Sequence, residues 1–82
     1  MPSESRDQRI HDLDATLRVG KNGIDAVVDE LDTQLGESQF VKVKFLRAAR
    51  GGTTSEALAE ELAERVGATV VRVRGHTAVF EQ

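Results

Sequence analysis

Residues 15–35, ATLRVGKNGIDAVVDELDTQL, contain the change of pattern that decides the fold class. Residues 16–19 alternate between polar and apolar side chains, and this period of two predicts a β-strand. From Ile24 to Leu35 the apolar residues recur at helical spacing, which predicts an amphipathic helix that ends at Gly36. A short glycine-containing segment joins the two, so this part of the chain is expected to form a β-loop-α unit.

The same change of pattern occurs a second time further along the chain. Residues 40–46, FVKVKFL, alternate again and predict a second strand whose two lysines point away from the core. The basic loop after it is expected to be flexible. The spacing of Thr53 and Glu56 fits a capping box, so we expect a third helix to start there and to end at Gly67.

The C-terminal part of the chain has the pattern of a β-hairpin. Residues 70–74 and 77–80 are rich in β-branched and apolar residues, and the dipeptide Gly75-His76 between them suits a two-residue turn. Two antiparallel strands are therefore expected here. The expected pairs on the buried face are Val71 with Phe80 and Val73 with Ala78.

These elements predict one α/β domain over residues 1–82, a two-layer α+β sandwich. A short helix is expected within residues 1–14, from capping residues after position 3, and the order of elements in the whole chain is αβαβαββ. Right-handed crossovers with the helices on one face predict a four-stranded mixed sheet with strand order 1-2-3-4. Because cations interrupt the strands, the opposite face of the sheet is expected to be open.

Composition excludes several classes of function. The sequence has no cysteine, so disulfides, thiolate metal sites and thiol nucleophiles are excluded, and a cytoplasmic location is expected. The first twenty residues carry charges throughout, which does not fit a secretion signal or a membrane span. When the residues are placed on the expected helices and strands, no catalytic or metal-ligating residues come together. We therefore expect no enzymatic activity, no cofactor, no metal and no small-molecule substrate.

The charges are divided between the two layers, although the formal net charge is -3. The second and third helices contain eight acidic residues, whereas the strands and their loops contain eight cations. The C-terminal ends of three parallel strands share one edge, where open α/β sheets bind ligands. The glycines of residues 20–23 would let a phosphate approach the amides at the helix start. The candidate anion-binding residues are Gly20, Lys21, Asn22, Gly23, Arg18, Lys42, Lys44, Arg47, Arg50, Arg72 and Arg74.

Each of these signals has a simpler structural explanation. A G-x-x-G motif alone is weak, because a strand-to-helix turn often requires glycine for steric reasons. Lysine and arginine on one face of a strand are commonly a solvated surface. His76 fits an exposed turn residue better than a ligand. The hypothesis of nucleic-acid binding depends on the convergence of the loop and the cations at one edge.

Three runs together resemble the YhbY-type CRM domain, the chloroplast RNA splicing and ribosome maturation domain family. They are LRVGKNGIDAVVDELDTQL at 17–35, FVKVKFL at 40–46 and GATVVRVRGHTAVF at 67–80. The resemblance covers roughly residues 15–81. It implies a fold similar to the C-terminal domain of initiation factor three, and a loop analogous to the one with which KH domains clamp nucleic acid.

The resemblance also implies a partner and a set of contacts. Single-domain members of the family associate with precursors of the large ribosomal subunit, so the expected partner is ribosomal RNA or such a particle, bound by a monomer. The residues that match the family's RNA contacts are Gly20, Lys21, Asn22 and Gly23, with Lys42, Lys44, Arg72 and Arg74 as supporting cations.

Two other functions remain open at this point. An Alba-like protein that coats nucleic acid has a similar order of elements, but it would be a dimer with a long projecting hairpin. A protein-interaction module would instead use the open sheet face, with the cations as its rim. Its docking residues would be Phe40, Leu46, Val70 and Val79.

Overall fold

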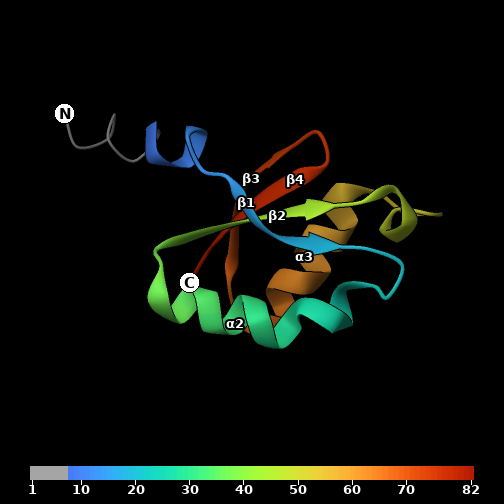
Figure 1. The fold of residues 1–82 in the computed structure, drawn as a ribbon, viewed down its shortest axis with the longest axis horizontal. Helices are drawn as coiled ribbons and strands as arrows, with labels where there is room; N and C mark the ends of the chain where they lie inside the picture. The colour runs from blue at the N-terminus through green and yellow to red at the C-terminus, as the bar shows by residue number, and fades with distance from the viewer. Residues whose placement is uncertain (1–7) are drawn as a thin grey trace.

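The computed structural model describes residues 8–82, which form a four-stranded sheet with helices against it (Figure 1). In chain order the elements are β1 (Ala15–Val19), the 3-10 helix η1 (Ile24–Val27), α2 (Val28–Glu37), β2 (Phe40–Phe45), the 3-10 helix η2 (Arg47–Ala49), α3 (Ser55–Val66), β3 (Thr69–Arg74) and β4 (Thr77–Glu81). Residues 8–11 form a helical turn before β1. The part of the expected first helix before residue 8 lies outside the described residues.

The strands are arranged in the order β1-β2-β4-β3, so the expected order 1-2-3-4 is wrong in its last two positions. β1 and β2 are parallel, and β4 is antiparallel to both β2 and β3. In β4, residues 78–80 are all buried, whereas β3 is only partly buried. A strand that is apolar on both faces belongs in the interior of a sheet. The crossover through α3 therefore passes over one position, and β4 fills it.

The directions of the strands agree with the prediction despite the different order. β1, β2 and β3 all run the same way, and Figure 1 shows their C-terminal ends on the right. The prediction assumed that the second crossover moved one strand along the sheet. A right-handed crossover can equally skip one position, and the local sequence does not distinguish the two steps.

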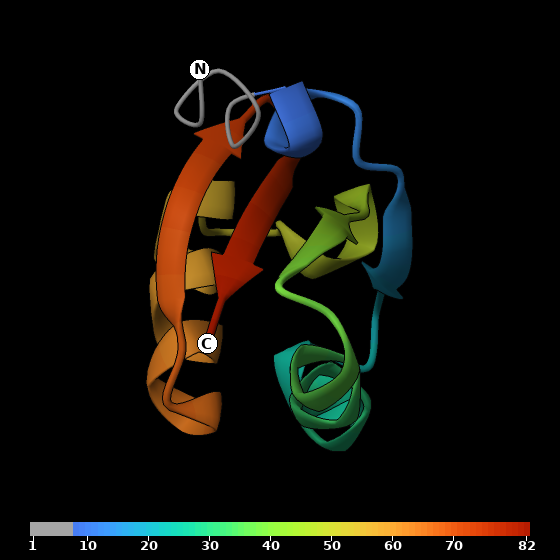
Figure 2. The ribbon, with the colours of Figure 1, turned by 90° about the vertical axis from the view of Figure 1, so that its left-hand side faces the viewer.

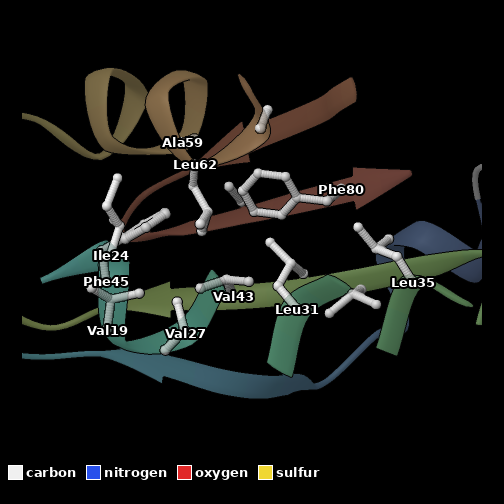
Figure 3. Close-up of a cluster of buried hydrophobic side chains, with 13 residues drawn as sticks. Val19, Ile24, Val27, Leu31, Leu35, Val43, Phe45, Ala59, Leu62 and Phe80 are labelled. Atoms are coloured by element: carbon white, nitrogen blue, oxygen red, sulfur yellow. The ribbon is translucent and has the colours of Figure 1, made fainter. Parts of the chain in front are cut away.

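The main core lies between the sheet and the helices α2 and α3 (Figure 3). β2 contributes Val41, Val43 and Phe45 to it, as the alternation predicts. Phe80 from β4 contacts the same cluster and is fully buried. The two lysines of β2 point to the other face, so one face of the sheet is apolar and the other carries cations.

The other face of the sheet is not fully open, contrary to expectation. The helical turn of residues 8–11 lies on it, on the side opposite α2 in Figure 2, and Ile10 packs against Phe40 and Val79 in a second buried cluster. The Arg9 guanidinium lies 5.3 Å from the centre of the Phe40 ring, within cation–π distance. Within residues 8–82, the helical turn therefore covers one end of this face through the buried Ile10 and the contact of Arg9 with Phe40.

Three local predictions differ from the structure. The N-cap of α3 is Thr54 and not Thr53: its Oγ1 accepts a 3.1 Å hydrogen bond from the Ala57 amide, so Glu56 is not the capping-box partner. The loop expected to be flexible contains η2. A bulge in β3 places Val70 opposite Phe80, where Val71 was expected.

The remaining local signals agree with the structure or differ by one residue. α2 continues through Gly36 to Glu37. α3 ends at Gly67, which has a left-handed backbone. Gly75 and His76 form the expected two-residue turn, with Arg74 paired to Thr77 across it. Turns and caps depend on neighbouring residues, which explains why these assignments are close.

Candidate functional site

The loops at the C-terminal edge of the sheet are joined by backbone hydrogen bonds. The Leu46 amide donates to the Val19 carbonyl at 2.8 Å, and the Phe45 amide donates to the His76 carbonyl at 2.7 Å. The end of β1, the end of β2 and the β3–β4 turn therefore lie side by side, on the right in Figure 1. The structure confirms the prediction that these loops converge at one edge of the sheet.

The loop of residues 20–23 is a tight turn closed by a 3.0 Å hydrogen bond from the Gly23 amide to the Gly20 carbonyl. It leads into the four-residue η1, and α2 begins only at Val28. The expectation that this loop meets the positive end of an α-helix is therefore wrong. The amides of Lys21 and Asn22 make no hydrogen bond within residues 8–82, and both residues are exposed. These two amides can receive an anion.

The two glycines of this loop have different roles. Gly23 has φ 80° and ψ -178°, a conformation that is essentially restricted to glycine. Gly20 has no positive φ, and a methyl group there would meet only the Leu46 Cδ1 at 3.8 Å, an ordinary contact. The fold therefore requires glycine at position 23 but not at position 20.

Alanine substitutions at these glycines should separate folding from binding. We expect Gly23→Ala to lower the free energy of unfolding by about 1–3 kcal/mol, because the new side chain forces strain. Gly20→Ala should change stability by less than about 0.5 kcal/mol. If an RNA phosphate approaches the backbone at Gly20, the methyl group added in Gly20→Ala should still weaken binding. Urea denaturation and RNA titration of both variants measure this. Full RNA affinity in stable Gly20→Ala would mean that no phosphate contacts Gly20.

A row of cations crosses the outer face of the sheet next to this edge. The Cα pairing runs from Arg18 to Lys44, then to Thr77, and then to Arg74. Neighbouring strands are about 4.8 Å apart, so Arg18 and Lys44 lie directly beside each other with like charge. The inserted β4 places an uncharged threonine between Lys44 and Arg74.

A second row contains Lys42 and Arg72, separated by Val79 of β4. The Lys42 Nζ donates to the Leu13 carbonyl at 3.2 Å, so this lysine also holds the N-terminal segment against the sheet. Arg72 and Arg74 line a pocket beside the helical turn, together with Lys42 and His11. Lys42 is therefore partly a structural residue, whereas Arg74 is exposed.

Of the two arginines after β2, one side chain is also bonded to the fold and the other is not. The Arg50 Nε donates to the Phe45 carbonyl at 3.1 Å, which fixes the guanidinium near the end of β2. The Arg47 side chain makes no hydrogen bond or ion pair within residues 8–82, and the residue is exposed. The structure thus divides the candidate cations between the loop edge, with Lys21, Arg47 and Arg50, and the outer sheet face, with Arg18, Lys42, Lys44, Arg72 and Arg74.

Nine acidic residues within residues 8–82 lie on the helices, whereas Asp12 and Asp14 precede β1 and Glu81 is in β4. All nine on the helices are exposed, and Arg65 of α3 pairs with Asp25 and with Glu61. Glu56, at the start of α3, lines a pocket with Arg50 and His76. Neither this carboxylate nor any other within residues 8–82 forms an ion pair with a candidate cation.

Sequence reasoning did not place Ser55 at this edge, and it assigned His76 only to the turn. Both line the same pocket as Glu56. The signal for Ser55 was its position at the start of the third helix, where backbone amides are free.

Two further findings concern the described part of the chain only. No cluster of three or more His, Cys, Asp or Glu side chains that could hold a metal ion occurs within residues 8–82. Over the same residues, no helix has the length and apolar character needed to span a bilayer.

The fold and the site define a two-layer α+β domain in which the cations of the loop edge and outer sheet face form no ion pair within residues 8–82. The CRS1 / YhbY (CRM) domain family matches residues 4–80, and the chain belongs to this family. The resemblance of the three runs to this family is thereby confirmed.

Two similar proteins are named for RNA. A probable RNA-binding protein of Methanocaldococcus jannaschii is 40% identical over 68 residues, which are 83% of this chain and 51% of that protein. This chain thus spans about half the length of that relative. The solution structure of a Staphylococcus aureus hypothetical protein, described as a candidate RNA-binding protein, superimposes with a TM-score of 0.73 at 26% identity. The match covers 93% of this chain and 78% of the other.

Proposed function

We propose that this domain binds RNA by its phosphate backbone, along the loop edge and the outer face of the sheet. The observation that carries the proposal is the pairing of Arg18 with Lys44, neither of which has a carboxylate partner within residues 8–82. Like charges on neighbouring strand positions destabilise a sheet. An anion bound between Arg18 and Lys44 would offset this repulsion.

Membership of the CRM family and the names of the two relatives support RNA as the source of that anion. We further propose that the RNA is ribosomal, within precursors of the large subunit, and that a monomer assists assembly without catalysing a reaction. Backbone contacts of this kind position a protein on RNA, and the shape of the RNA then supplies the specificity. Sequencing of RNA crosslinked to the protein in cells tests this assignment, and crosslinks without enrichment of precursor ribosomal RNA would contradict it.

Reversing one charge of the pair should raise stability while it lowers RNA affinity. In Lys44→Glu the new carboxylate lies beside Arg18, so we expect the free energy of unfolding to rise by about 0.2–1 kcal/mol. We expect RNA affinity to fall about tenfold, because one phosphate contact is lost and a repulsion is added. Denaturation and filter binding measure the two effects.

Arg65→Glu is the matched control, because it makes the same change in net charge on the helix side of the molecule. RNA affinity within about twofold of the wild type is expected for it. If both variants lose affinity equally, net charge and not this surface controls binding.

The two alternative functions predict different surfaces. A protein-interaction module needs an open apolar face, but Phe40 and Val79 are buried beneath Ile10, and Val70 packs into the helix-side core. That docking surface is therefore wrong. An Alba-like dimer needs a long hairpin, whereas β3 and β4 are joined by two residues. Light scattering, with RNA competed against duplex DNA, tests what remains of the dimer alternative.

A further inference from the structure

A pocket lies between the start of α3 and the β3–β4 turn. Its lining is Arg50, Thr53, Thr54, Ser55, Glu56, Val73, Gly75 and His76. The turn is held in place, because the His76 carbonyl accepts from the Phe45 amide and the Thr77 hydroxyl donates to the Arg74 carbonyl at 2.9 Å. The wall formed by His76 is thus built into the sheet.

The first turn of α3 leaves donors free at this pocket. Thr54 caps the Ala57 amide, and the Leu58 amide donates to the Thr54 carbonyl at 3.0 Å. The amides of Ser55 and Glu56 make no hydrogen bond within residues 8–82. Because α3 is a regular helix of 12 residues, its partial positive charge is at this end.

The Ser55 side chain is the second observation that points to a ligand. Only 7% of its surface is exposed, and its hydroxyl has no hydrogen-bond partner within residues 8–82. No fully enclosed polar side-chain atom in that range lacks a partner, so the Oγ keeps some solvent access, and Ser55 lines the pocket. A ligand in the pocket can therefore accept a hydrogen bond from this hydroxyl, which no group within residues 8–82 uses.

Arg50 and His76 complete the walls of a site for an anion. The Arg50 Nε is bonded to the Phe45 carbonyl, which leaves its two terminal nitrogens free to donate. The His76 ring is exposed on the opposite wall. Glu56 is the one unfavourable group, and its carboxylate makes no ion pair within residues 8–82. Two amides, a hydroxyl and a guanidinium match the acceptor oxygens of a phosphate.

We infer that this pocket binds a phosphate group of the RNA backbone, separately from the contacts at residues 20–23 and on the sheet face. This inference rests on the proposed function for the source of the phosphate. The pocket adjoins the loop edge, so one RNA strand could contact both.

Titration of the isotope-labelled protein with inorganic phosphate, at constant ionic strength against chloride, tests the site by backbone NMR. We expect saturable shifts of the Ser55, Glu56 and His76 amides. Ser55→Ala should weaken both phosphate and RNA binding about threefold to tenfold, because one hydrogen bond to an anion is lost. Its melting temperature should stay the same or rise. Glu56→Gln should strengthen both, since a repulsion is removed.

Ser38→Ala is the matched control, because Ser38 is exposed at the far end of α2. Absence of phosphate-dependent shifts at the pocket overturns the inference. So does unchanged RNA affinity in Ser55→Ala with phosphate still binding, which would assign the pocket to a free phosphate ester. If Lys44→Glu still weakens RNA binding in either case, the proposed function stands. Failure of the wild-type protein to bind RNA would remove both proposals.

Discussion

Replacing Lys21, Arg47 and Arg74 together by glutamine is expected to lower RNA affinity by roughly 100-fold at about 0.1 M salt. Each lost contact with single-stranded RNA reduces the slope of log affinity against log salt by about 0.7, so three contacts reduce it by about 2. All three side chains are exposed, and within residues 8–82 they form no ion pair. Their loss removes no contact that holds the fold.

Binding titrations over a series of salt concentrations measure the slope directly. The melting temperature serves as the control, and we expect it to change little, since exposed substitutions alter stability by less than about 0.5 kcal/mol. An unchanged slope in the triple variant would show that RNA does not contact these three cations, and the proposed interface would have to be abandoned.

The largest loss of stability is expected from Phe80→Ala. Phe80 is fully buried at the centre of the sheet and packs into the core between β4 and the two helices (Figure 3). Truncation leaves a cavity that close-packed neighbours cannot fill, which costs about 3–5 kcal/mol. This is a large share of the 5–15 kcal/mol that stabilises an ordinary domain.

Urea denaturation, followed by circular dichroism, measures the loss. Leu46→Ala is the control, because Leu46 is the large apolar residue that remains 36% exposed among residues 8–82, and its truncation should cost less than about 1 kcal/mol. A loss as small as this for Phe80 would mean that β4 is not an interior strand of the sheet.

Most of the secondary structure could be predicted from the sequence, because its signals act over a few residues. The alternation in β2 depends on side-chain geometry within one strand, and Gly67 ends α3 through its own backbone conformation. The Gly75-His76 turn has the same local origin. The separation of the acidic helices from the basic strands also follows from counting charges element by element.

The candidate site was predictable as a list of cations but not as a surface. That the loops after β1, β2 and β3 meet at one edge follows from the parallel directions of the strands, which the sequence implies. The hydrogen bonds from Arg50 to the Phe45 carbonyl and from Lys42 to the Leu13 carbonyl do not follow from the sequence. Such bonds depend on distances between segments, and no local pattern records them.

By itself the sequence determined the elements, their polarity and the family to which the chain belongs. Only the tertiary structure decided that β4 lies between β2 and β3, and that Ile10 covers part of the outer sheet face. It also decided that Ser55 and His76 share a pocket. The physical reason is that these features depend on which surfaces bury each other most completely. Alternative packings compete for this burial, and the competing residues are far apart in the chain.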